Sequence, residues 1–167
     1  MIETKNLSKQ FKAPTEEKGL FGKKKKPFWA VKDLNFKIEK GKVASILGPN
    51  GCGKTTTLRM IAGMLTPSKG TAFVDDIDVR KDKQAVKSKI GYMTNNTSLY
   101  DRLNVLETIK FFAELNQIPE DIYKPRAAAL FDQLDMNDYL TKRVADLSTG
   151  MKQKTSIVRT LIHDPDL

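Results

Sequence analysis

The stretch Gly48-Pro49-Asn50-Gly51-Cys52-Gly53-Lys54-Thr55 decides the fold class that we predict for this chain of 167 residues. It satisfies the pattern G-x-x-x-x-G-K-[ST], and it follows the compact apolar run 42–47. The next segment, 55–65, places its apolar residues on one helical face. A strand, a glycine-rich turn and a helix in this order predict an α/β fold with a phosphate-binding loop, the P-loop, at residues 48–55.

The residue types of the P-loop suit a nucleoside triphosphate with Mg²⁺. Glycines allow successive N–H groups to point toward an anion, and the following helix adds the positive end of its dipole. Lys54 is expected to bridge the β- and γ-phosphates, Thr55 to ligate Mg²⁺ and Thr56 to bond the α-phosphate. The predicted binding residues are Gly48, Pro49, Asn50, Gly51, Cys52, Gly53, Lys54, Thr55 and Thr56. A glycine-rich turn that only caps a helix is the alternative, and the loop alone does not name the reaction.

The composition is that of an ordinary soluble domain and excludes several classes of protein. No apolar run approaches the roughly eighteen residues that a membrane span needs. Residues 1–11 carry charges and no apolar stretch, unlike a secretory signal. Cys52 is the only cysteine, which excludes an internal disulfide and a cysteine-cluster zinc site. These features fit a cytosolic compartment.

The net charge of +9 is concentrated near the N-terminus. The run Lys23-Lys24-Lys25-Lys26 lies in segment 12–28, whose prolines, glycines and lysines predict an exposed insertion. Lysines beside Phe28 and Trp29 are able to bind anionic lipid or nucleic-acid phosphates. Because the run is short and lacks a recognition motif, we interpret it as a solvated loop and expect no specific nucleic-acid partner.

Hydrophobic patterning divides the chain into three regions. Residues 1–40 are expected to form an antiparallel β region that contains the insertion, residues 41–102 the P-loop core, and residues 103–163 a helical subdomain. The expected strands lie at 2–6, 30–38, 42–47, 71–74 and 89–93. The expected helices lie at 55–65, after a capping box at Asn104 and Glu107, at 127–134 and at 150–162.

A second motif, Leu147-Ser148-Thr149-Gly150-Met151-Lys152-Gln153-Lys154, narrows the class. It resembles the LSGGQ signature of ATP-binding cassette (ABC) ATPases, and residues 48–56 are close to that family's P-loop. The resemblance implies that ATP is the nucleotide and that Ser148 and Gly150 contact the γ-phosphate bound by a partner subunit. Exposed amides at a helix start suit that role, although Ser-Thr-Gly before a helix is by itself most often an N-cap. Thr149 and Met151 depart from the family's usual glycine and glutamine.

The resemblance assigns two further residues to the nucleotide site. Phe11 corresponds to the aromatic residue that stacks on adenine in this family; the alternative is a core residue that closes the small sheet. Asn95 stands where the family has a glutamine that touches Mg²⁺ and the attacking water; the alternative is a polar turn after a strand. Thr55 and Asn95 are therefore the predicted metal ligands.

The family's Mg²⁺-holding aspartate and catalytic glutamate have no counterpart in the chain, which reaches Leu167 just after the turn His163-Asp164-Pro165. No catalytic residue is therefore predicted. We expect a C-terminally incomplete ABC nucleotide-binding domain that binds ATP and does not hydrolyse it alone.

The resemblance implies the ATP-binding subunit of an ABC transporter, which hydrolyses MgATP in its full-length dimer to drive transport. The expected partners are a second nucleotide-binding domain and a transmembrane permease subunit, on the cytoplasmic face of the membrane. Residues 97–103 and the signature look most like the sodium-extrusion or ABC-2-type exporter branch. The alternatives are a soluble ABC ATPase that acts on nucleic acid or ribosomes, and a small-molecule kinase, which leaves the signature unexplained.

Overall fold

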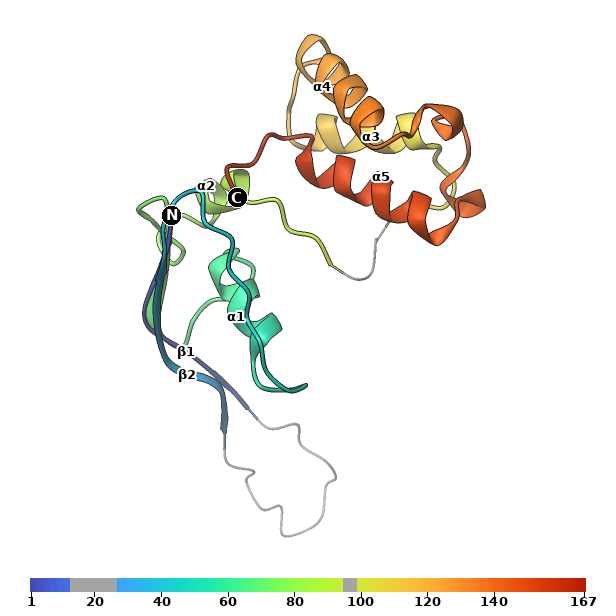
Figure 1. Ribbon diagram of the computed structural model, residues 1–167. Coiled ribbons are helices and arrows are strands. Elements are labelled where there is room, and N and C mark those ends of the chain that lie inside the picture. The colour runs from blue at the N-terminus through green and yellow to red at the C-terminus, as the bar shows by residue number, and fades with distance from the viewer. Residues whose placement is uncertain (13–26, 95–98) are drawn as a thin grey trace, which may run out of the picture. The chain divides into compact units, whose positions relative to one another are not determined.

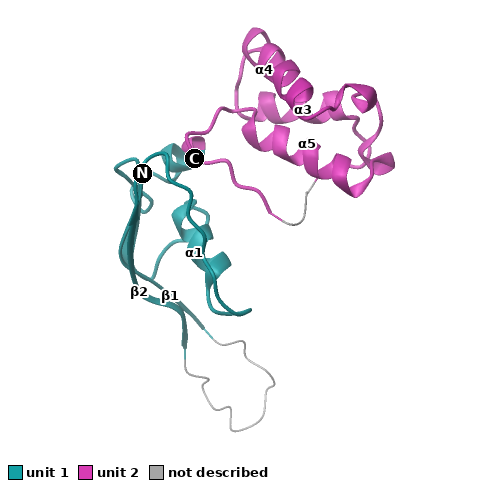
Figure 2. Cartoon of the chain, viewed as in Figure 1, with its two compact units in different colours: residues 1–87 teal, residues 88–167 magenta. Residues whose placement is uncertain are grey.

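The structure is a computed structural model that describes residues 1–12, 27–94 and 99–167 (Figure 1). These residues form two compact units, residues 1–87 and residues 88–167 (Figure 2). An antiparallel sheet with helix α1 (Lys54–Ile61) makes up most of the first unit, and three helices make up most of the second. None of the helices in the described ranges is both long and apolar enough to span a bilayer. Most of the predicted insertion at 12–28 lies outside the described residues.

The sheet of the first unit has four antiparallel strands in the order β2-β1-β3-β4. The strands are β1 (Ile2–Phe11), β2 (Phe28–Ile38), β3 (Lys69–Val74) and β4 (Ile77–Asp78). The strands predicted at 2–6, 30–38 and 71–74 are confirmed, and each is longer than predicted. β1 exceeds its predicted length by the most residues, because its pairing with β2 continues as far as Phe11, which lies opposite Phe28.

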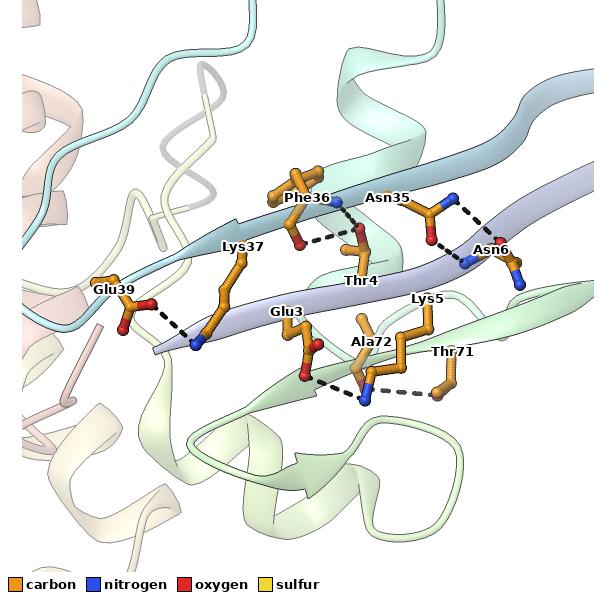
Figure 3. Close-up of polar contacts among 10 residues, drawn as sticks. All are labelled: Glu3, Thr4, Lys5, Asn6, Asn35, Phe36, Lys37, Glu39, Thr71 and Ala72. Atoms are coloured by element: carbon orange, nitrogen blue, oxygen red, sulfur yellow. Dashed lines mark hydrogen bonds and ion pairs between the residues drawn. The ribbon is translucent and has the colours of Figure 1, made fainter.

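Polar side chains hold β1 and β2 together where their register shifts, between Thr4 and Leu7. Asn6 has a φ of 49°, and its N–H donates to Asn35 Oδ1 at 2.8 Å (Figure 3). Asn35 Nδ2 donates in return to Asn6 Oδ1 at 3.1 Å, and the Phe36 N–H donates to Thr4 Oγ1 at 2.9 Å. These bonds replace ladder bonds that a bulge removes, so the hairpin stays paired along its length.

Helix α1 (Lys54–Ile61) packs on one face of the sheet. Met60 and Ile61 of the helix are buried, as are Ala72 and Val74 of β3. The helix is shorter than the predicted 55–65, because Gly63 has a φ of 66° and ends it in a Schellman motif. In this motif the Gly63 N–H donates to Met60 O at 3.1 Å and the Met64 N–H to Arg59 O at 2.9 Å. A short helix, α2 (Lys83–Lys89), follows β4.

The prediction of a buried parallel strand at 42–47 is wrong. This run forms no strand, and Val43 is 99% exposed and Leu47 89%. A parallel strand is stable only where neighbours pair its backbone. The strands in the described part of the chain pair only with one another, so the run lacks such a neighbour.

The strand predicted at 89–93 is also absent as a regular strand, although part of its pairing is present. The Leu167 N–H donates to Lys89 O at 3.1 Å, and the Gly91 N–H donates to Leu167 O at 2.8 Å. This exchange, in which one residue bonds to the two neighbours of another, is the hydrogen-bond pattern of a parallel pair. The sequence therefore predicted the pairing tendency of this segment but overestimated its length.

The second unit is a helical bundle of α3 (Val105–Leu115), α4 (Glu120–Gln133) and α5 (Thr149–Leu161). Two 3-10 turns, Asn137–Tyr139 and Val144–Asp146, lie between α4 and α5. The predicted capping box is confirmed: the Glu107 N–H donates to Asn104 Oδ1 at 2.8 Å and the Asn104 N–H to Glu107 Oε2 at 2.9 Å. The buried faces of the helices contribute Val105, Ile109, Ala113, Tyr123, Ala127, Phe131 and Val158 to one core.

Helix α4 begins well before the predicted 127–134 and includes Pro125, a residue type that usually breaks or kinks a helix. The proline removes one intrahelical hydrogen bond near the start of the helix. Burial of Tyr123 and Ala127, on either side of it, compensates for that loss.

Candidate functional site

The lysine of the P-loop folds back over the loop that precedes it. Lys54 Nζ donates to Gly48 O at 2.7 Å and to Pro49 O at 2.8 Å. The loop itself turns at Cys52, whose N–H donates to Pro49 O at 3.3 Å. The Lys54 ammonium group thus lies against the carbonyl oxygens of the first two residues of the loop.

Glycine is required at the end of the P-loop by a close approach to β2. Gly53 has a φ of 98°, and a Cβ there would lie 2.4 Å from Ala30 O and 3.0 Å from Val31 Cγ2. Such distances exclude any side chain. Sequence reasoning missed Ala30 as the residue that fixes the loop, because no local pattern reveals which strand passes behind it.

The start of α1 is open to an anion. Its first N–H groups lack intrahelical acceptors by geometry, no side chain caps them, and its first turn carries no acidic residue. Thr55 is exposed and Thr56 half-buried. Free amides, a helix dipole and the Lys54 ammonium form a donor set that fits a polyphosphate. The remaining predicted residues, Pro49, Asn50, Gly51 and Cys52, are exposed in the same loop.

The signature motif forms the start of α5 in the second unit. Ser148 is its N-cap, and its Oγ accepts from the Met151 N–H at 3.3 Å. Ser148, Thr149 and Gly150 are all exposed, and a Cβ at Gly150 would meet no atom within 4 Å. Met151, one of the two departures from the family pattern, packs half-buried against the helical core. The residue that replaces the usual glutamine is therefore used for packing.

The two residues assigned only by resemblance differ in what the structure describes. Phe11 is half-buried at the end of β1, and its ring centroid lies 5.9 Å from that of Phe28. Asn95 lies outside the described residues, so Thr55 is the one predicted metal ligand whose position is described. Among the described residues no cluster of three His, Cys, Asp or Glu side chains could hold a metal ion without a nucleotide.

Comparison with known proteins decides the family. Residues 31–167 match the family described as ABC transporter. The chain belongs to the ABC transporter family. This ABC chain is 45% identical over 148 residues to the ABC transporter ATP-binding protein NatA of Bacillus subtilis (strain 168), covering 88% of this chain and 60% of NatA. It is 33% identical over 169 residues to the choline transport ATP-binding protein OpuBA of the same organism, covering 100% of this chain and 41% of OpuBA.

Solved structures of ABC proteins share the fold. The dimeric ATP-binding cassette MJ0796 bound to ADP and Pi matches with a TM-score of 0.78 and 25% identity, over 99% of this chain and 71% of that chain. The ABC chain described here thus spans 60% or less of NatA and OpuBA and 71% of the MJ0796 cassette. The resemblance predicted from the P-loop and signature is confirmed, and the sodium-extrusion branch is consistent with the similarity to NatA.

Proposed function

We propose that this chain is part of the ATP-binding, energy-coupling subunit of an ABC transporter, and that residues 48–56 bind MgATP. The observation that carries the proposal is the P-loop geometry: Lys54 Nζ rests on two loop carbonyls beside an uncapped helix start. Binding of a triphosphate would replace these neutral acceptors by charged phosphate oxygens, which form stronger bonds to an ammonium group. The N–H groups of the first turn of α1 would hold the remaining oxygens.

The other predicted residues have complementary roles in this proposal. Thr55 and Asn95 would hold Mg²⁺, which supplies charge neutralisation at the β- and γ-phosphates when bound. Phe11 would stack on adenine. Ser148 and Gly150 would contact the γ-phosphate held by a second nucleotide-binding domain, because the start of α5 is exposed and carries no acidic residue. We assign no general base within residues 1–167, and propose that they bind ATP without hydrolysing it.

The proposed partner in the membrane is a permease subunit, which would place the protein on the cytoplasmic face of the membrane. The second unit exposes an apolar surface made by Tyr100, Phe111 and Leu115, beside the half-buried Phe112. Tyr100 and Phe111 stack edge to face with centroids 5.3 Å apart, and Tyr100 is 54% and Leu115 64% exposed. Exposed apolar side chains that cluster in this way mark interaction surfaces. We propose that the permease docks on this surface.

Nucleotide binding by Lys54→Ala in the full-length protein tests the ATP site. The substitution should weaken MgATP binding on the order of 100-fold, since charge-assisted hydrogen bonds contribute about 3 kcal/mol. Lys40→Ala is the matched control, because Lys40 is an exposed lysine outside the loop. Isothermal titration calorimetry measures both. Equal affinities in the two variants would exclude the proposed role of the P-loop.

Co-purification with the permease tests the docking surface. Phe111→Asp should reduce recovery of a polytopic membrane subunit while leaving MgATP affinity unchanged. Leu106→Asp provides the control, because Leu106 is also exposed on α3 but lies on another side of the helix. If both variants retain the membrane subunit equally well, the permease docks elsewhere.

A further inference from the structure

The hairpin of β1 and β2 ends in three aromatic side chains, Phe11, Phe28 and Trp29. Only Phe11 has a role in the proposed nucleotide site so far. Phe28 is the direct cross-strand partner of Phe11, and Trp29 is the partner of Gln10. The rings of Phe11 and Phe28 are tilted by 31° with centroids 5.9 Å apart, within the range of favourable aromatic pairs. Phe28 is 51% exposed although its ring is paired.

The two neighbouring aromatic residues of β2 lie on opposite faces of the sheet. The Trp29 ring has Lys69 Nζ 5.4 Å from its centroid. Lys69 alternates with the buried Ala72 and Val74 of β3, so it lies on the face away from α1. Successive residues of a strand point to opposite faces, which puts Phe28 on the face that carries α1.

The P-loop lies on the same face as Phe28 and Phe11. Gly53 approaches β2 at Ala30 O and at the side chain of Val31, which is buried beneath α1. Register supports this placement: Val31 pairs with Lys9, whose ammonium lies 5.3 Å from the centroid of the Phe11 ring. Lys9 and Phe11 therefore share a face, as residues two apart in a strand do. Phe28 lies on this face as well, because it is the cross-strand partner of Phe11.

We propose that Phe28 binds the nucleobase, and that Phe28 and Phe11 together form a two-ring platform beside the P-loop. The inference rests on the proposed function, because it takes ATP as the ligand. The loop that would hold the triphosphate contacts β2 where Gly53 approaches Ala30, and Ala30 is two residues away from Phe28. Every nucleobase presents a π face, which stacks on an exposed aromatic ring and removes both surfaces from water. One face of Phe11 already carries the Lys9 ammonium, which leaves Phe28 as the more accessible ring.

Phe28→Ala in the full-length protein tests the platform, with ATP and inorganic tripolyphosphate titrated in parallel. Loss of one stacking ring should weaken ATP binding about 5- to 50-fold and leave tripolyphosphate binding unchanged. Phe28→Leu keeps an apolar side chain without a π face and should behave like Phe28→Ala, whereas Phe28→Tyr should bind ATP as the wild type does. Trp29→Ala is the matched control, because it removes the neighbouring ring from the other face and should leave both affinities unchanged.

The two ligands separate the possible failures. Wild-type affinity for ATP in Phe28→Ala would overturn the platform. An equal loss of ATP and tripolyphosphate would also overturn it, because Phe28 would then support the loop rather than the base. If the wild type bound neither ligand, the proposed function itself would fail, and the platform with it.

Discussion

Helices α1 and α5 both have a first turn without acidic residues, and they differ in how that turn is fixed. The start of α1 is held by contact of Gly53 with the backbone of β2, and Lys54 is already placed in the loop. The start of α5 is capped by Ser148, and Gly150 faces open space. The first arrangement suits an anion bound by one chain, whereas the second leaves room for a group that another molecule presents.

A third helix shows what a start without an anion site looks like. In α3, Asn104 and Glu107 satisfy each other's N–H groups, and Glu107 places a negative charge in the first turn. The capping box therefore supplies partners to these N–H groups within the chain, and the negative charge of Glu107 repels phosphate. The first turns of α1 and α5 have neither the acidic residue nor the reciprocal capping box of α3, and substitution of their glycines should separate fold from function.

The largest effect is expected from Gly53→Ala. The new Cβ would lie 2.4 Å from Ala30 O, and the φ of 98° is unfavourable for alanine. We expect a loss of about 2 to 4 kcal/mol in unfolding free energy, with loss of ATP binding. Urea denaturation monitored by circular dichroism measures the first effect, and calorimetry the second. A variant of wild-type stability would show that the loop does not press against β2.

Gly150→Ala should leave the fold intact and impair only the contact with a second copy of the domain. A Cβ at Gly150 meets no atom within 4 Å, and alanine is favoured over glycine in a helix by about 1 kcal/mol. Stability and ATP binding by the isolated protein should therefore be unchanged or slightly better. Dimer formation with a non-hydrolysable ATP analogue should fall about 10-fold or more, because the methyl group blocks close approach of the γ-phosphate. Analytical ultracentrifugation tests this; an unchanged dimer constant would contradict the proposed contact.

The sequence predicts features that depend on neighbouring residues better than features that depend on contacts between distant segments. The family, the helices that follow the P-loop and the signature, and the capping box of α3 are predicted correctly, because each depends on residues within one or two turns. The run 42–47 has the composition of a buried strand, yet its state depends on neighbours that its own residues do not specify. Pairing of Phe11 with Phe28 was equally hidden, since the register of the hairpin crosses segment 13–26, which carries no local signal for it.

Packing explains two further differences between sequence and structure. Met151 departs from the family's usual glutamine in the sequence, and in the bundle it packs against the core. The helix predicted at 127–134 starts earlier and includes Pro125, which removes only one hydrogen bond in a helix whose next turn is buried. In both cases a tertiary contact decides the role of the residue, and no short pattern contains that contact.

The sharpest test of α5 comes from paired substitutions of Ser148, whose expected effect on stability is small. Ser148→Ala removes the N-cap and should cost about 1 kcal/mol in unfolding free energy, with ATP binding by the isolated protein unchanged. Ser148→Asp keeps a good N-cap and gains from the helix dipole, so its stability should equal or exceed that of the wild type. Both variants should form fewer ATP-dependent dimers.

The aspartate variant should be the more defective of the two in dimer formation, although it is the more stable. Its carboxylate would face the γ-phosphate of the partner and repel it, whereas alanine only removes one donor. If Ser148 acts solely as a cap, the order reverses, because aspartate then restores what alanine removes. The ranking of the two variants in dimerisation, measured beside their unfolding free energies, therefore separates a helix cap from a phosphate contact.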